Sequence, residues 1–279
     1  MLKVIKIELY KIFRKWRSYI GFIAIGLLVP VIQIAMMVEG ERSLDFMTRS
    51  LQQNFFFVGN LLNGYLVSYI ILNVLVIHIP FLVTLVAGDL LAGEATAGTY
   101  RLLITRPISR IKLVTAKFIA GIIYTNMLVL FLGVISLGLG YLIFGFGELI
   151  VVNSGGVTIF AREDVLWRFL LGYGFASLSM MVVTTLAFLF SSLVENAIGP
   201  IITTMAIIIV FVIISAINIG IFQSIRPYLF TTYMSSWRLF FSDPIDYAEI
   251  LKSAGILAGH IAALFGITVY LFNRKDILT

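Results

Sequence analysis

Residues 65–87 read YLVSYIILNVLVIHIPFLVTLVA and hold no Lys, Arg, Asp or Glu. As a helix, a stretch of this length is about 35 Å long, because each residue adds about 1.5 Å. The hydrocarbon core of a bilayer is about 30 Å thick, so one such helix can cross it. The stretch therefore predicts a transmembrane helix and a fold built in lipid.

Five further stretches have similar length and also lack charged residues. They are 19–37, 118–144, 169–190, 200–222 and 254–272. The 279-residue chain is 60% hydrophobic and 12% charged, about half the charge of an ordinary soluble domain. We therefore expect an all-α membrane protein with six transmembrane helices, forming a single domain over residues 1–279. This composition excludes an ordinary soluble enzyme.

Charge is distributed unequally between the two sides that six crossings create. Both chain ends fall on one side, which carries a net charge of +8, whereas the other side carries −2; together they give the net charge of +6. Loops rich in Lys and Arg stay in the cytoplasm. We therefore expect both termini, and the long loop 88–117, to be cytoplasmic.

Residues 1–18 carry the pattern of an amphipathic helix. Apolar residues recur at helical spacing at Leu2, Ile5, Leu9, Ile12, Phe13 and Trp16, and most of the cations lie opposite. Such a helix lies in the membrane interface with its cations near anionic headgroups. We expect an interfacial elbow helix anchored by Arg14, Lys15, Trp16 and Arg17. The alternative interpretation is a generic positively charged flank of the first transmembrane helix.

The loop after the second transmembrane helix reads GDLLAGEATAGTYRLLITRPISRIKLVTAK over 88–117. Residues 90–97 favour a short helix, and Pro107 ends a second helical stretch over 100–105. Ser109 is suited to cap the helix that leads into the third transmembrane segment. A short helix held outside the bilayer is typical of a docking element, although a plain connecting loop is the alternative.

Glu94, one of two acidic residues in this loop, is expected to hold the short helix through charge-assisted bonds to Arg101, Arg106 or Arg110. Alternatively, it pairs with a basic group on a partner protein.

The motif residues of the loop resemble the signature of ABC type-2 transporter permeases. They are Glu94, Gly98, Thr99, Leu102, Leu103, Pro107, Ser109, Arg110 and Lys117. The resemblance implies a coupling helix that sits in a cleft of a separate ATPase subunit. On this basis we assign ATPase coupling to Glu94, Gly98, Thr99, Arg101, Leu102, Leu103, Pro107 and Arg110.

The same resemblance implies an ABC exporter in a prokaryotic plasma membrane. Two permease chains, identical or different, would form the translocation path, and two ATPase subunits would bind ATP and Mg²⁺. No lysine in this chain follows a glycine, so the phosphate-binding GxxxxGK[ST] motif cannot occur. We expect no catalytic residue, cofactor or metal on this chain, and no nucleic-acid partner. The alternatives are a membrane scaffold or immunity component without transport, or a channel or secondary carrier.

Three further features have open interpretations. Aromatic residues at Tyr233, Trp237, Phe240 and Phe241 are typical of an interfacial belt or of an outer gate that re-enters the membrane. His78 and His260 are expected to be neutral and hydrogen-bonded between helices. Small residues four apart in 254–266 favour close helix packing, either within the chain or against a second chain.

Overall fold

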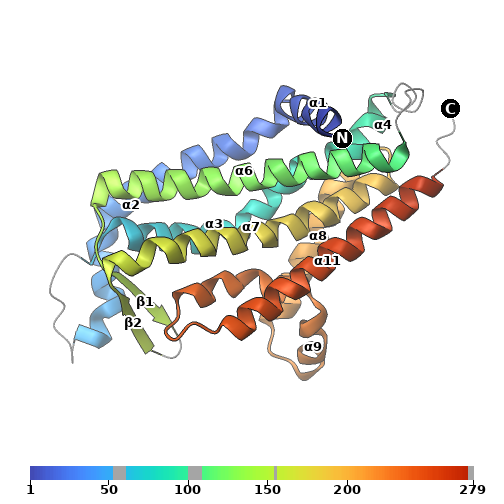
Figure 1. Ribbon diagram of the computed structural model, residues 1–279. Helices are drawn as coiled ribbons and strands as arrows, with labels where there is room; N and C mark the ends of the chain where they lie inside the picture. Colours follow the sequence, from blue (N-terminus) through green and yellow to red (C-terminus); the bar gives the residue numbers. More distant parts are fainter. Residues whose placement is uncertain (53–60, 100–108, 154–155, 276–279) are drawn as a thin grey trace.

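The computed structural model describes residues 1–52, 61–99, 109–153 and 156–275 (Figure 1). It is mostly helical, with one small antiparallel hairpin. In chain order the elements are α1 (Leu2–Arg14), α2 (Arg17–Gln52), α3 (Gly64–Ala87), α4 (Asp89–Thr96), α6 (Arg110–Phe144), β1 (Leu149–Asn153), β2 (Gly156–Phe160), α7 (Arg162–Leu193), α8 (Ile198–Ala216), α9 (Gly220–Ile225), η1 (Arg226–Tyr228), α10 (Phe230–Tyr233), η2 (Met234–Phe241) and α11 (Tyr247–Arg274).

Six of the described helices are long and apolar enough to cross a membrane, so the protein is a multi-pass membrane protein. They are α2, α3 together with α4, α6, α7, α8 and α11. Each predicted stretch lies within one of these helices, except the fifth. The fifth helix ends at Ala216 instead of continuing to Phe222. Asn218 and Gly220 follow, and both residue types are poor helix formers.

Helices α3 and α7 form the centre of the bundle. Helix α7 packs against α3, α6, α8 and α11, and α2 covers α3 and α6. Helix α1, α4 and the end of α11 lie at one end of the molecule, which we call the terminal end (Figure 1). The hairpin of β1 and β2 lies at the opposite, hairpin end. The central helices therefore connect an end formed by helices with an end that carries the β-hairpin.

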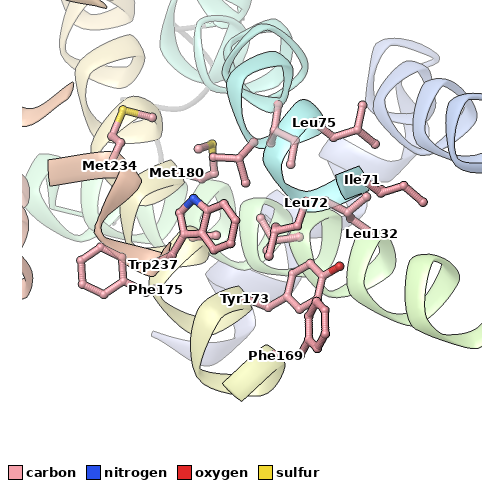
Figure 2. Packing of buried hydrophobic residues seen from close by; sticks show 14 of the residues in the cluster. Ile71, Leu72, Leu75, Leu132, Phe169, Tyr173, Phe175, Met180, Met234 and Trp237 are labelled. Atoms are coloured by element: carbon pink, nitrogen blue, oxygen red, sulfur yellow. The ribbon is translucent and has the colours of Figure 1, made fainter. Parts of the chain in front are cut away.

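The largest hydrophobic cluster fills the space between the central helices (Figure 2). Leu72 of α3, Leu132 of α6 and Met180 of α7 are fully buried in it. Phe169 stacks on Tyr65 with ring centroids 5.8 Å apart. Because the two rings come from different helices, this stacking fixes α7 against α3 near the hairpin end.

The segment of α10 and η2 re-enters the bundle between α8 and α11. Ser179 Oγ donates a hydrogen bond to the carbonyl of Met234. Ser179 lies about 21 Å along α7 from its end at Leu193 and about 26 Å from its beginning at Arg162, given the helical rise. Met234 therefore packs beside the middle of a membrane helix, and not at a surface.

All four aromatic residues predicted for a belt or gate are buried in this re-entrant segment. Their side chains are those of Tyr233, Trp237, Phe240 and Phe241. Tyr69 of α3 makes edge contacts with Trp237 and Phe241, at centroid distances of 5.9 and 5.0 Å. The belt interpretation is therefore wrong for these residues, because their rings fill the interior of the chain. Tyr228 is exposed instead.

Segments on either side of the predicted transmembrane helices have structure that their residue pattern does not predict. Helix α2 continues to Gln52, well beyond the apolar run. After α6, the chain forms a hairpin in which Leu149 pairs with Phe160 and Asn153 pairs with Gly156. Asn63 caps α3 by accepting hydrogen bonds from the backbone N–H groups of Tyr65 and Leu66. Its side chain also donates to the carbonyl of Glu148, which ties the hairpin to α3.

The burial of Trp237 gives a test of the re-entrant segment. We expect Trp237→Ala to lower the free energy of unfolding by about 3–5 kcal/mol, because it opens a cavity among α3, α7 and η2. Tyr228→Ala is the matched control, since that exposed ring is expected to change stability by less than about 0.5 kcal/mol. Thermal unfolding of both variants in detergent measures the difference. Equal melting temperatures would mean that the segment does not pack in the core.

Candidate functional site

The motif residues Gly98 and Thr99 follow the last turn of α4. Gly98 has φ +65°, a left-handed conformation that glycine adopts at little cost. Its N–H donates to the carbonyl of Ala95, and the N–H of Thr99 donates to the carbonyl of Glu94, both at 3.0 Å. This pair of bonds is the Schellman motif. The Gly-Thr pair therefore turns the chain sharply away from α4 towards residues 100–108.

Both ends of α4 are held by α7 and the turn that follows it. Ser191 Oγ accepts hydrogen bonds from the N–H groups of Leu91 and Ala92 at 3.0 and 2.9 Å. It thereby caps α4 from another helix. At the other end, Thr96 Oγ1 donates to the carbonyl of Glu195 at 2.7 Å. Helix α4 is therefore mounted on the bundle at both ends.

Glu94 is the centre of an ion-pair network that joins α1, α4 and α6. Glu94 Oε1 lies 2.8 Å from Lys11 Nζ and 2.8 Å from Lys117 Nζ. Lys117 Nζ also lies 2.6 Å from Glu8 Oε2, and Lys11 Nζ lies 3.0 Å from Glu8 Oε1. The hydroxyl of Thr99 donates to the second oxygen of Glu94. Two carboxylates and two ammonium groups thus form one electrically balanced cluster.

The inner half of this network is removed from solvent. The side chains of Lys117 and Glu8 are 2% and 4% exposed, and that of Glu94 is 13% exposed. A buried charge is tolerated only when it is paired and hydrogen-bonded. Burial lowers the pKa of Lys11, but the hydrogen bonds and charges of Glu94 and Glu8 outweigh it and raise that pKa above its usual value. Lys11 is therefore charged near neutral pH.

A second set of ion pairs lies beside the network, around Asp89 at the start of α4. Lys15 Nζ lies 2.5 Å from Asp89 Oδ2, and an Arg17 nitrogen lies 3.3 Å from Asp89 Oδ1. Two of the four predicted membrane anchors therefore contact α4. The other two, Arg14 and Trp16, are exposed.

The predicted coupling residues are distributed unequally in the structure. Glu94, Gly98 and Thr99 lie together at the end of α4. Arg110 lies elsewhere, where it donates to the carbonyls of Asn273 and Lys275 at the end of α11. The remaining predicted coupling residues fall outside the described residues; they are Arg101, Leu102, Leu103 and Pro107.

Glu94 has partners that the sequence-based expectation did not include. Lys11 and Lys117 bind it and Arg110 does not, whereas Arg101 and Arg106 lie outside the described residues. The sequence held a signal for this, because Glu8 lies between Ile5 and Ile12 on the apolar face of α1. All three of these residues are buried. An acidic residue on the buried face of a helix requires a basic partner, and Lys117 supplies it from α6. The predicted cap at Ser109 is confirmed.

Both histidines bond within their own helices, so the expectation of hydrogen bonds between helices is wrong. Nδ1 of His78 contacts the carbonyl of Val74, and Nδ1 of His260 contacts the carbonyl of Ile256. His260 is partly buried and meets Phe230 edge-on, at a centroid distance of 6.1 Å. His78 is exposed on α3.

Comparison with known proteins assigns this six-helix membrane protein to a family. A family model described as "Protein of unknown function (DUF2705)" matches residues 20–278, so the chain belongs to that family. The chain is also similar to the uncharacterized protein YhcI of Bacillus subtilis (strain 168). The two are 30% identical over 118 residues, which make up 40% of this chain and 37% of that protein.

The network predicts a strong penalty for removing one buried charge. We expect Lys117→Met to lower the free energy of unfolding by about 3–5 kcal/mol, because Glu8 and Glu94 then share the single cation of Lys11. Adding Glu8→Gln should recover part of this loss, since the charges balance again. Thermal unfolding of the single and double variants in detergent measures this coupling. If the two substitutions destabilise additively, the four groups do not act as one network.

The exposed pair of Arg42 and Glu39 gives the control for this experiment. These groups lie 3.5 Å apart, with side chains 85% and 61% exposed. Arg42→Gln should therefore change stability by no more than about 1 kcal/mol.

Proposed function

We propose that the protein is the permease subunit of an ABC exporter, driven by a separate ATPase subunit. The proposal combines the ABC type-2 loop motif with a six-helix membrane fold. In this proposal the terminal end faces the cytoplasm of a prokaryotic cell and α1 lies in the membrane interface. Two permease chains form the translocation path in the plasma membrane, and two ATPase subunits bind to them on the cytoplasmic side. ATP and Mg²⁺ bind to the ATPases alone.

The observation that carries this proposal is the mounting of α4. Its last turn precedes residues 100–108, the segment expected to dock into the ATPase. Glu94 attaches that turn to α1 and α6, and Ser191 attaches its beginning to α7. A coupling element needs such a rigid connection, because displacement of the docked segment must move whole helices rather than bend a loop. A plain connector has no need of a buried ion-pair network.

The outward face of α3 supports the proposal that a second permease chain is present. Val74, Ile77, His78 and Phe81 are exposed on this otherwise central helix, and Asn73 is partly exposed. A polar imidazole facing lipid in the middle of a membrane helix is costly, and such groups usually face other helices or a water-filled path. We infer that a second chain covers this face and that the path runs between the two chains.

The small residues of α11 are also directed outward. Among the described residues, no atom of another element lies within 4 Å of a Cβ atom added at Gly255, Gly259 or Gly266. Of the two interpretations of this pattern, close packing inside the chain is therefore wrong at these three positions. A face of this kind allows another helix to approach closely.

Docking of the ATPase gives the main test. We expect Leu103→Asp to weaken binding of the partner ATPase at least tenfold, because a buried apolar side chain contributes about 1.5–3 kcal/mol to docking. Val157→Asp, which places the same charge on the exposed hairpin at the opposite end, should leave binding unchanged. Co-purification and titration with the ATPase measure both, and melting temperatures show that each variant is folded. Normal binding by Leu103→Asp would remove the support for a docking segment.

Placement in the membrane gives a second test. The chain contains no cysteine, so single cysteines can be introduced as reporters. In intact cells, an impermeant thiol reagent should label Val157→Cys at the hairpin end and fail to label Arg106→Cys until the membrane is opened. Labelling of Arg106→Cys from outside would show that the orientation is opposite to the one proposed. The loop would then lie on the side of the membrane where a cytoplasmic ATPase cannot bind it.

A further inference from the structure

A pocket of about 330 Å³ lies at the terminal end, between α1, the end of α3, α4 and the start of α6. One part of its lining is charged and includes Lys15 and Asp89. Another part is apolar and includes Ile12, Val86 and Leu90. A lining of this mixed kind suits an amphipathic molecule better than a fully polar solute.

The charges in the lining do not balance. The network of Glu8, Lys11, Glu94 and Lys117 is neutral in sum. Outside it, Asp89 carries one negative charge opposite both Lys15 and Arg17. Arg14 also lines the pocket and has no acidic partner among the described residues. The described residues of the lining therefore carry two more positive than negative charges, and this excess comes entirely from positions 14–17.

The excess charge lies where a membrane surface is expected. Arg17 begins α2, the first helix that is apolar enough to cross the membrane. Trp16 lies between the cations with its side chain exposed, and tryptophan prefers the level of lipid headgroups. A neighbouring hollow, lined by Lys15, Trp16 and Arg17, also reaches the apolar Ile198 of α8. Charged groups at the surface and apolar groups beneath them match the order of headgroup and acyl chain in a phospholipid.

We propose that this pocket binds the headgroup of an anionic phospholipid. Its phosphate lies against Arg14, Lys15 and Arg17, and the upper part of its acyl chains contacts the apolar lining. The excess of positive charge selects an anionic headgroup over phosphatidylcholine, whose own cation cancels its phosphate charge. The bound lipid would connect α1 with α4, because its phosphate bridges cations that already contact Asp89. This inference does not depend on the proposed transport function.

Binding of lipid to the purified full-length chain in detergent tests the proposal. Trp16 is the reporter, and quenching of its fluorescence by brominated phosphatidylglycerol is titrated against brominated phosphatidylcholine. Trp16→Phe identifies the part of the signal that comes from this residue. We expect saturable quenching with at least tenfold tighter binding of phosphatidylglycerol. Equal affinity for the two lipids would overturn the proposal.

Two double variants separate this site from general attraction to anionic surfaces. Arg14→Gln with Arg17→Gln should weaken phosphatidylglycerol binding at least tenfold. Lys3→Gln with Lys6→Gln removes the same charge from exposed positions of α1 outside the pocket, and should change the affinity less than twofold. Equal losses in the two variants would show a diffuse surface effect and refute the site. Because Arg14 has no acidic partner, Arg14→Gln alone keeps the test valid if the first double variant does not fold.

Soluble glycerol 1-phosphate distinguishes a lipid from a free phosphate ligand. It carries the same charged group without acyl chains, so it should compete with brominated phosphatidylglycerol only weakly. Competition at concentrations similar to those of the lipid would show that the apolar lining contributes nothing, and would overturn the assignment to a phospholipid.

Discussion

The terminal end of this protein depends on the burial of one ammonium group, that of Lys117. The group lies between Glu8 of α1 and Glu94 of α4, and its side chain is almost fully removed from solvent. Charges in such a place are tolerated only when all of their partners are present. Helices α1 and α4 must therefore both lie against α6, and the position of α1 over the bundle follows from this constraint.

The two ends of the bundle are stabilised by different interactions. Ion pairs and capping hydrogen bonds hold the terminal end together. Aromatic rings, most of them in edge contact, fill the hairpin end and the re-entrant segment. Helices α3 and α7 run through both regions. A protein that couples an event at one end to a rearrangement at the other needs rigid central helices of this kind, which is consistent with the proposed permease function.

The local parts of the fold could be predicted from the sequence because their causes are local. Charge-free runs predicted the membrane helices, Ser109 predicted the start of α6, and the turn after α4 requires a left-handed residue that Gly98 supplies. The hairpin and the re-entrant segment could not be predicted in this way. Trp237 and Phe241 have the composition of an interfacial belt, and only their contacts with Tyr69 show that they are buried.

Hydrophobicity, length and charge are properties of contiguous residues, so the sequence alone predicts six membrane helices and shows where charge accumulates along the chain. Which charges meet is set by the packing of the helices. Arg110 is closer in sequence to Glu94 than Lys117 is, yet Glu94 pairs with Lys11 and Lys117, 83 and 23 residues away. That choice depends on how α1 and α6 pack, because a carboxylate that becomes buried must take its partners from whichever helices surround it.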